Sequence, residues 1–146
     1  MVNTIISDKL YIGDVEDARH LHEYHTSFDR VVTVGEDIAQ ESTDEHYPIP
    51  DGGWGFDPDE HYPIFRQAVN TVRTALVGGE RVFVHCRAGQ SRSAAVCIAA
   101  IATLDGSSFE EAYLEVRHSR PIITLSEELQ ECAKKFIREY QIHFDR

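Results

Sequence analysis

A cysteine and an arginine six positions apart are the residues of this chain with the clearest chemical potential. Cys86 and Arg92 enclose residues 87–91, which include Gly89 and follow the compact apolar run 82–84. A buried strand that turns into a helix through such a loop directs successive backbone N–H groups inward, where they bind an anion. The helix dipole adds positive potential and favours the thiolate form of the cysteine. The loop therefore offers a nucleophile and an anion hole around one phosphorus atom.

The spacing of these two residues is a weak signal alone, and its setting makes it specific. A strand pattern precedes the loop, a glycine lies in its middle, and Ser93 follows Arg92. Residues 94–104 are apolar nearly all round, which is typical of a central buried helix. Arg92 can bind two oxygens of a phosphate at once. The alternative interpretation is a structural turn with a core cysteine at position 86.

Phosphoryl transfer also needs a proton donor for the leaving oxygen and a base for the attacking water. A segment rich in proline and glycine, residues 47–58, offers acidic candidates in and just after it, namely Asp51, Asp57 and Asp59. Asp51 lies between a proline and two glycines, where a rigid segment meets a flexible one. Asp57 precedes a proline and fits the N-cap of the next helix. We therefore prefer Asp51 as the acid, with Asp57 as the alternative.

Residues 85–93, His-Cys-Arg-Ala-Gly-Gln-Ser-Arg-Ser, resemble the signature loop of cysteine-based protein phosphatases in its dual-specificity form. The resemblance covers most of the chain. Residues 5–14 resemble the opening strand pair of that family, and residues 47–51 resemble the segment that delivers its general acid. Residues 117–121 resemble its late basic turn.

The resemblance implies a role for each matching residue. Cys86 would attack phosphorus to form a phosphocysteine, and Arg92 would bind the phosphate and stabilise the transition state. Ser93 would hydrogen-bond the thiolate when it leaves in the second step. His85 would orient the loop, and Asp51 would serve as general acid and base. No metal or organic cofactor is implied.

The loop residues predicted to bind substrate are Arg87, Ala88, Gly89, Gln90, Ser91 and Arg92. Gln90 is neutral at a position where related lipid phosphatases often carry lysine, which argues against a polyphosphoinositide substrate. Arg120 is expected either to bind a second acidic feature of the substrate or to pair with nearby carboxylates.

The whole chain, residues 1–146, is predicted to be one α/β domain. Strand and helix patterns alternate, which is typical of a mostly parallel sheet of four to five strands flanked by helices. The phosphate-binding loop is expected between a central strand and a buried helix, where such sheets bind ligands. The predicted strands are 4–12 (a strand or hairpin), 31–34 and 81–84. The predicted helices are 14–25, 58–76, 91–104, about 109–118 and a last one opened by Thr124 with Glu127, while 35–46 is predicted as a surface loop or a poor helix.

The chain is strongly acidic, with 14 basic and 25 acidic residues and a formal net charge of −11 at pH 7. Such a surface repels nucleic acid and anionic membranes, so we expect neither as a partner. It suits a salt-rich cytoplasm, as in a halophilic archaeon. No window is apolar enough for a membrane span and no secretory signal is visible, so a cytoplasmic monomer is expected.

Cys97 and Cys132 lie in apolar helical patterns and are predicted to be small core residues. A disulfide that protects Cys86 from over-oxidation is the alternative.

The preferred function is hydrolysis of phosphotyrosine, phosphoserine and phosphothreonine in phosphoproteins. No extended phosphotyrosine-recognition loop is visible near the N-terminus, so the cleft is expected to be shallow enough for all three. The alternatives are a catalytically silent phosphate-binding module, sulfur transfer of the rhodanese kind, and hydrolysis of a small phosphorylated metabolite or nucleotide.

Overall fold

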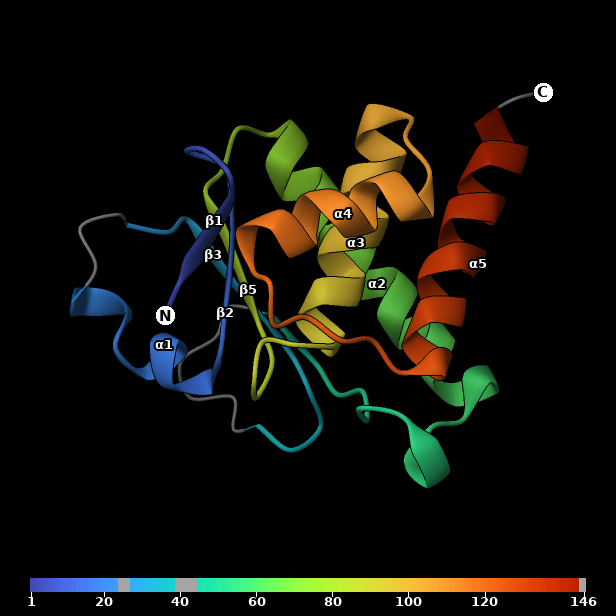
Figure 1. The fold of residues 1–146 in the computed structure, drawn as a ribbon, viewed down its shortest axis with the longest axis horizontal. Coiled ribbons are helices and arrows are strands. Elements are labelled where there is room, and N and C mark those ends of the chain that lie inside the picture. The colour runs from blue at the N-terminus through green and yellow to red at the C-terminus, as the bar shows by residue number, and fades with distance from the viewer. Residues whose placement is uncertain (24–26, 39–44, 145–146) are drawn as a thin grey trace.

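The structure, a computed structural model, describes residues 1–23, 27–38 and 45–144 (Figure 1). Its strands are β1 (Asn3–Ile6), β2 (Leu10–Gly13), β3 (Arg30–Val34), β4 (Glu45–Tyr47) and β5 (Val82–His85). They form a five-stranded sheet of order β1-β2-β5-β3-β4. The β2–β5, β5–β3 and β3–β4 pairs are parallel, and the β1–β2 pair is antiparallel. The prediction of a single-domain α/β fold with a mostly parallel sheet is confirmed.

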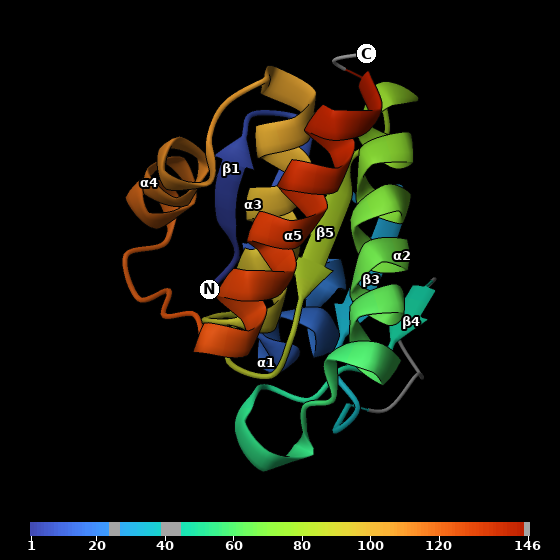
Figure 2. The ribbon, with the colours of Figure 1, turned by 90° about the vertical axis from the view of Figure 1, so that its right-hand side faces the viewer.

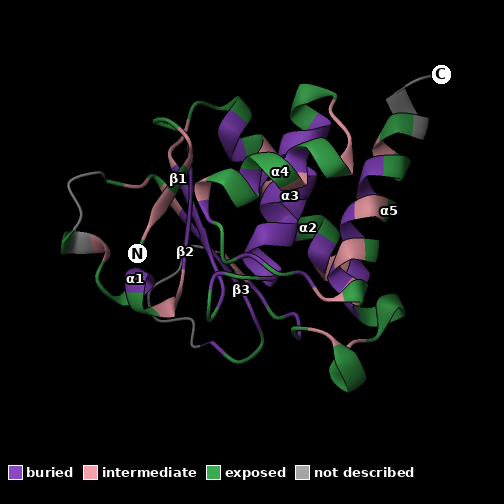
Figure 3. Cartoon of the chain, in the orientation of Figure 1, coloured by how far each residue is buried: buried purple, intermediate pink, exposed green. Residues whose placement is uncertain are grey.

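The helices are α1 (Val15–Arg19), α2 (Pro58–Val77), α3 (Arg92–Asp105), α4 (Phe109–Ser119) and α5 (Glu127–Phe144), with 3₁₀ turns at Leu21–Glu23 and Gly53–Gly55. Helices α2 to α5 lie on one side of the sheet, and α1 lies apart from them (Figures 1 and 2). Helix α3 packs against α2, α4 and α5, and it is buried along most of its length (Figure 3). None of the helices in the described part of the chain is long and apolar enough to cross a membrane.

Alternating side chains of β5 divide the core between the two faces of the sheet. Val82 and Val84 belong to the large cluster under helices α2 to α5. Phe83 points to the other face, where it packs with Ala18 of α1 and Val31 of β3 in a smaller cluster. This alternation is expected because successive strand residues face opposite sides. Strand β5 is therefore buried on both faces, as a central parallel strand should be.

Helix boundaries follow local signals in the sequence. Asp57 caps α2, with its side chain accepting from the N–H of Asp59 at 3.0 Å, and proline occupies the first turn. Ser108 and Glu111 form the capping box of α4. The prediction of Thr124 as the cap of the last helix is wrong. Ser126 has that position, because its hydroxyl accepts from the N–H of Leu129 at 3.3 Å.

Two other predicted elements differ from the structure. The helix predicted over 14–25 is helical only as the short α1 and the following 3₁₀ turn, and residues 24–26 lie outside the described residues. The stretch 35–46, predicted as a loop or poor helix, runs into edge strand β4, and its residues 39–44 lie outside the described residues. Strand β4 is three residues long and pairs only with β3 among the described strands, so it lacks the apolar run of a central strand.

Parallel pairing brings the carboxyl ends of three strands to one edge of the sheet. Gly13 of β2 and Thr33 of β3 are both in register with His85 of β5. The segments that follow these strands therefore start side by side. In open α/β sheets this edge is where ligands bind.

Candidate active site

The loop 86–91 connects β5 to α3 at this edge and leaves no room for a side chain at Gly89. Gly89 has a φ of +67°, which residues with a side chain rarely adopt. A Cβ there would lie 2.6 Å from the carbonyl oxygen of Gly13 and 2.7 Å from Nη2 of Arg120. The loop is therefore pressed against β2 and against the turn after α4.

Four consecutive carbonyl groups of the loop accept hydrogen bonds from groups outside it. The pairs are Arg87 O with Val15 N (3.0 Å), Ala88 O with Arg120 Nη2 (3.2 Å), Gly89 O with Arg120 Nε (2.7 Å) and Gln90 O with Thr124 N (2.8 Å). The C=O and N–H groups of a trans peptide point in opposite directions. The N–H groups of residues 88–91 are therefore turned inward, in the arrangement that binds an anion.

Arg120 has a different environment from the one expected of it. Its side chain is buried, and Nη1 donates to the carbonyl oxygen of Met1 at 2.8 Å and to Oδ1 of Asn3 at 2.6 Å. Its remaining donors hold the loop carbonyls described above. Among the described residues Arg120 has no carboxylate partner, and its burial removes it from the surface where substrate would bind. Arg120 instead orients the loop by donating hydrogen bonds to its main-chain carbonyl groups.

Cys86 lines a cavity of about 470 Å³ beside this loop. The cysteine is 2% exposed, and its Sγ is 3.2 Å from Oγ of Ser93 in the first turn of α3. The cavity is lined by Asp37, Asp51, Cys86, Arg87, Ala88, Gln90, Ser91, Arg92, Thr124, Leu125 and Ser126. Most of the predicted site residues thus line one cavity, while Gly89 shapes the loop without lining it.

Arg92 is the buried cation of this cavity, with 4% of its surface exposed. Nη1 donates to Oδ1 of Asp37 at 2.7 Å and to the carbonyl oxygen of Ile49 at 3.0 Å. Nε is buried and has no hydrogen-bond partner among the described residues, and it lies 3.7 Å from Oδ1 of Asp51. Burial alone would lower the pKa of Arg92, but the bond to Asp37 and the nearby Cys86 and carboxylates raise it. The arginine therefore stays charged, with a donor left for an incoming anion.

The two acid candidates have different positions. Asp51 lines the cavity, and its side chain is 67% exposed. Asp57 is the N-cap of α2 and does not line the cavity. The Asp51 segment is held against the start of α5. The N–H of Gly53 donates to Oε1 of Glu128 at 2.8 Å, and a Cβ on Gly52 would lie 2.7 Å from Oγ of Ser126.

Asp37 is the site residue that sequence reasoning missed. It lies in the turn after β3 and lines the cavity beside Arg92. Nε of Arg87 donates to Oδ2 of Asp37 at 2.8 Å, so the arginine predicted to bind substrate is already paired. Asp37 stands among other acidic residues in 35–46, and nothing in that pattern distinguishes it. Only the pairing of β3 with β5 brings it to the loop.

Comparison with known proteins identifies the family. The model of the dual specificity phosphatase catalytic domain matches residues 10–139. The chain belongs to the dual-specificity phosphatase family. Family and fold together make it a phosphatase.

Curated relatives agree with this assignment, and solved structures share the fold. Human dual specificity protein phosphatase 22 is 27% identical over 139 residues, which cover 90% of this chain and 74% of that protein. Human dual specificity protein phosphatase 1 is 38% identical over 60 residues, which cover 41% of this chain and only 16% of that protein. The crystal structure of human DUSP28 has the same fold, with a TM-score of 0.77 at 19% identity, over 96% of this chain and 95% of that chain. A structure of PTPMT1 in complex with PI(5)P shares the fold with a TM-score of 0.71 at 19% identity, over 97% of both chains.

His85 precedes the cysteine of this dual-specificity phosphatase and is buried beneath the loop. Its Nε2 lies 2.7 Å from Oγ1 of Thr33 on the neighbouring strand, and its ring stacks on Phe83. Its Nδ1 is 3.4 Å from the carbonyl oxygen of Cys86. Burial lowers the pKa of His85 to about 4, although the Cys86 carbonyl and nearby carboxylates oppose the shift. The imidazole is therefore neutral near pH 7.

The buried neutral histidine predicts a loss of stability of the phosphatase in acid. Between the ordinary pKa of 6.5 and the folded value of about 4, the unfolded chain binds the proton and the folded chain does not. The contribution of neutral His85 to the free energy of unfolding is therefore complete above pH 6.5, and it declines as the pH falls toward 4. We expect His85 to cost about 2 kcal/mol of unfolding free energy between pH 7 and pH 5. Urea unfolding of wild type and His85→Gln at both pH values checks this, because the variant should lose less over the same interval. Equal losses in both proteins would contradict it.

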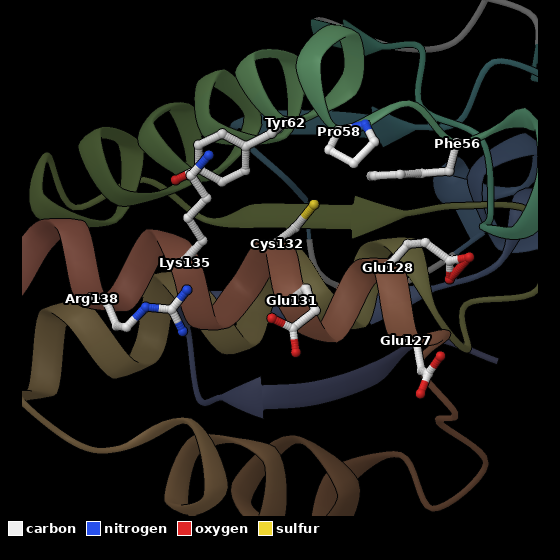
Figure 4. A pocket seen from close by; sticks show the side chains of 9 residues that line it. All are labelled: Phe56, Pro58, Tyr62, Glu127, Glu128, Glu131, Cys132, Lys135 and Arg138. Carbon is white, nitrogen blue, oxygen red and sulfur yellow. The ribbon is translucent and has the colours of Figure 1, made fainter.

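The two other cysteines of the phosphatase are buried, as predicted, and all three thiols are free. Burial raises the pKa of Cys97 in α3 far above its usual range and that of Cys132 to about 11. Cys132 faces another cavity, of about 510 Å³, between the start of α2 and α5 (Figure 4). Phe56 and Tyr62 also line it. Neither Cys86 nor Arg92 lines this second cavity. The Cys132 thiol stays protonated near pH 7, so the second cavity does not offer a thiolate nucleophile.

Proposed function

We propose that this chain hydrolyses phosphate monoesters of phosphoproteins, on tyrosine and on serine or threonine, through a phosphocysteine formed on Cys86. One observation carries the proposal. Cys86, Arg92 and Asp51 all line a single cavity, and Nε of Arg92 has no hydrogen-bond partner among the described residues. A nucleophile, an anion donor and an acid at one point are the parts that phosphoryl transfer requires. The catalytic unit proposed is one domain over residues 1–146.

In the first step the Cys86 thiolate attacks phosphorus, and the bond from phosphorus to the ester oxygen breaks. Asp51 gives its proton to that oxygen, which leaves as the alcohol or phenol. The Nε and Nη2 edge of Arg92 and the N–H groups of residues 88–91 bind the phosphoryl oxygens. The charge that develops on these oxygens is then met by donors already in place.

In the second step water attacks the phosphocysteine, and the Asp51 carboxylate takes the proton from that water. The S–P bond breaks, inorganic phosphate forms, and the thiolate is released. Ser93, with its hydroxyl 3.2 Å from Sγ, donates a hydrogen bond to the departing thiolate. His85 keeps the start of the loop in place through its contact with Thr33.

The rim of the cavity supports a substrate with a single phosphate. Gln90 is neutral, and Nε of Arg87 already donates to Asp37, so neither side chain offers an unpaired cation to a second phosphate. With a net charge of −11, the surface also disfavours long polyanions. These features favour phosphoproteins over polyphosphoinositides, although a structural neighbour, PTPMT1, has been solved with PI(5)P.

Hydrolysis of para-nitrophenyl phosphate in excess chelator, at low and at molar salt, tests the chemistry. We expect turnover that resists the chelator, and a phosphate adduct on the Cys86 peptide by mass spectrometry after acid quench. Phosphotyrosine, phosphoserine and phosphothreonine peptides, PI(5)P and a nucleoside monophosphate then compare substrate classes. A kcat/KM larger for PI(5)P or the nucleotide than for every peptide would overturn the substrate assignment. Phosphate binding without turnover would indicate a silent binding module, and thiosulfate sulfurtransferase activity would indicate sulfur transfer.

A further inference from the structure

Asp37 is held in place by the backbone around it rather than projecting freely from a loop. The N–H of Gly35 donates to the carbonyl oxygen of Tyr47 at 2.9 Å, and that of Glu36 donates to the carbonyl oxygen of Ile49 at 3.2 Å. On the other side of Asp37, the Ile38 side chain is buried. The carboxylate thus sits on a turn fixed at both ends, which is what a positioning group requires.

The carboxylate binds one particular edge of the Arg92 guanidinium. Its Oδ1 accepts from Nη1 at 2.7 Å and its Oδ2 lies 3.4 Å from Nη2, which is the end-on pairing. A guanidinium has a second edge, formed by Nε and Nη2, that can bind two oxygens. Because Asp37 takes the end-on edge, Nε on the side-on edge is left without a hydrogen-bond partner among the described residues, and Arg92 lines the cavity.

Arg87 fixes the same carboxylate from the solvent side. Its Nε donates to Oδ2 at 2.8 Å, and its Nη2 donates to the main-chain carbonyl oxygen of Asp37. Burial would raise the pKa of Asp37, but the bonds from Arg92 and Arg87 outweigh it and hold that pKa well below its usual range. Asp37 therefore remains an anion between two cations near neutral pH.

Gly35 leaves the space that this arrangement needs. A Cβ at Gly35 would lie 2.9 Å from Nη1 of Arg92 and 3.0 Å from Oδ1 of Asp37. A side chain at position 35 would therefore displace the Arg92–Asp37 ion pair while both charges remain. The glycine provides a second, independent way to disturb the same contact.

From these contacts we infer that Asp37 is a positioning residue that sets the guanidinium of Arg92 side-on to the phosphoryl group. The inference rests on the proposed function. Asp37 does not touch the substrate, and it acts through the orientation of Arg92. Without the Asp37 carboxylate the charge of Arg92 remains in the cavity. The Nε and Nη2 edge of its guanidinium, which binds the equatorial oxygens of the transition state, is then no longer fixed in orientation.

The test compares Asp37→Asn with Glu36→Gln, a neighbouring carboxylate that is exposed and makes the same change of charge. We expect kcat for para-nitrophenyl phosphate to fall about 10- to 100-fold in Asp37→Asn, since a small misplacement of a catalytic group has effects of this size. The inhibition constant of inorganic phosphate should change by no more than about threefold, because the loop N–H groups and the charge of Arg92 persist. Asp37→Glu should recover part of kcat, and Gly35→Ala should lower it with the charge unchanged.

Three results would overturn the inference. The first is a kcat for Asp37→Asn within about twofold of the Glu36→Gln value. The second is a fall in kcat matched by loss of phosphate binding and of the thermal transition, which would assign Asp37 to folding alone. The third is a wild-type enzyme that turns over no phosphate ester, which removes the proposed function itself. In the first two results the wild type hydrolyses the ester, so the proposed function stands while the role of Asp37 fails.

Discussion

Replacing Cys86 with serine is expected to lower kcat by about 10⁴-fold or more, to the background of the assay. The serine hydroxyl is far harder to ionise than the thiol, so the first bond to phosphorus no longer forms. The cavity itself should survive, because the loop carbonyls are held by Arg120, Val15 and Thr124 from outside the loop. Initial rates with para-nitrophenyl phosphate, together with calorimetric titration by inorganic phosphate, measure the two effects separately.

Cys132→Ser is the matched control for this substitution. It makes the same change of atom at another buried thiol, outside the Cys86 cavity. Its kcat should stay within about twofold of wild type. A Cys86→Ser enzyme that kept a tenth or more of wild-type kcat would remove the phosphocysteine from the mechanism. Loss of phosphate binding as well as turnover would show instead that the loop had been disrupted.

The sequence predicted the elements of this fold wherever a local pattern specified them. The cap at Asp57 marks the start of helix α2 within the sequence itself. The apolar run that enters the loop and the buried helix that leaves it are likewise local. The loop of Cys86 and Arg92 could therefore be located, with its setting, from the sequence alone.

What the sequence did not reveal depends on contacts between distant segments. Asp37 pairs with Arg92 across 55 positions of the chain. Nothing in the local sequence distinguishes this carboxylate from its acidic neighbours. Arg120 bonds to main-chain carbonyls, which every residue possesses, so no partner side chain indicates its role. Ser126 and Thr124 are both acceptable caps by type. In the structure the N–H of Thr124 donates to the carbonyl oxygen of Gln90, and Ser126 caps α5. In each case a backbone or tertiary contact decides between residues of similar local propensity.

If Asp51 is the general acid, its replacement should cause the second large loss of kcat. Asp51→Asn is expected to lower kcat about 10²- to 10³-fold for an ester with a poor leaving group, because the departing oxygen then receives no proton. The loss should shrink for an activated aryl phosphate, whose leaving oxygen needs little protonation. Steady-state kinetics on a series of aryl phosphates with different leaving groups measures both losses.

Asp57→Asn is the control that distinguishes the two acid candidates. Asparagine caps helices as well as aspartate does, so α2 should keep its N-cap while the titratable proton is lost. Its kcat should stay within about threefold of wild type on every leaving group. A greater loss in Asp57→Asn than in Asp51→Asn would assign the acid to the helix cap, and the 51–58 segment would then have to rearrange around the substrate. The position of Asp51 in the cavity, with its Oδ1 3.7 Å from Nε of Arg92, is the reason to expect the opposite order.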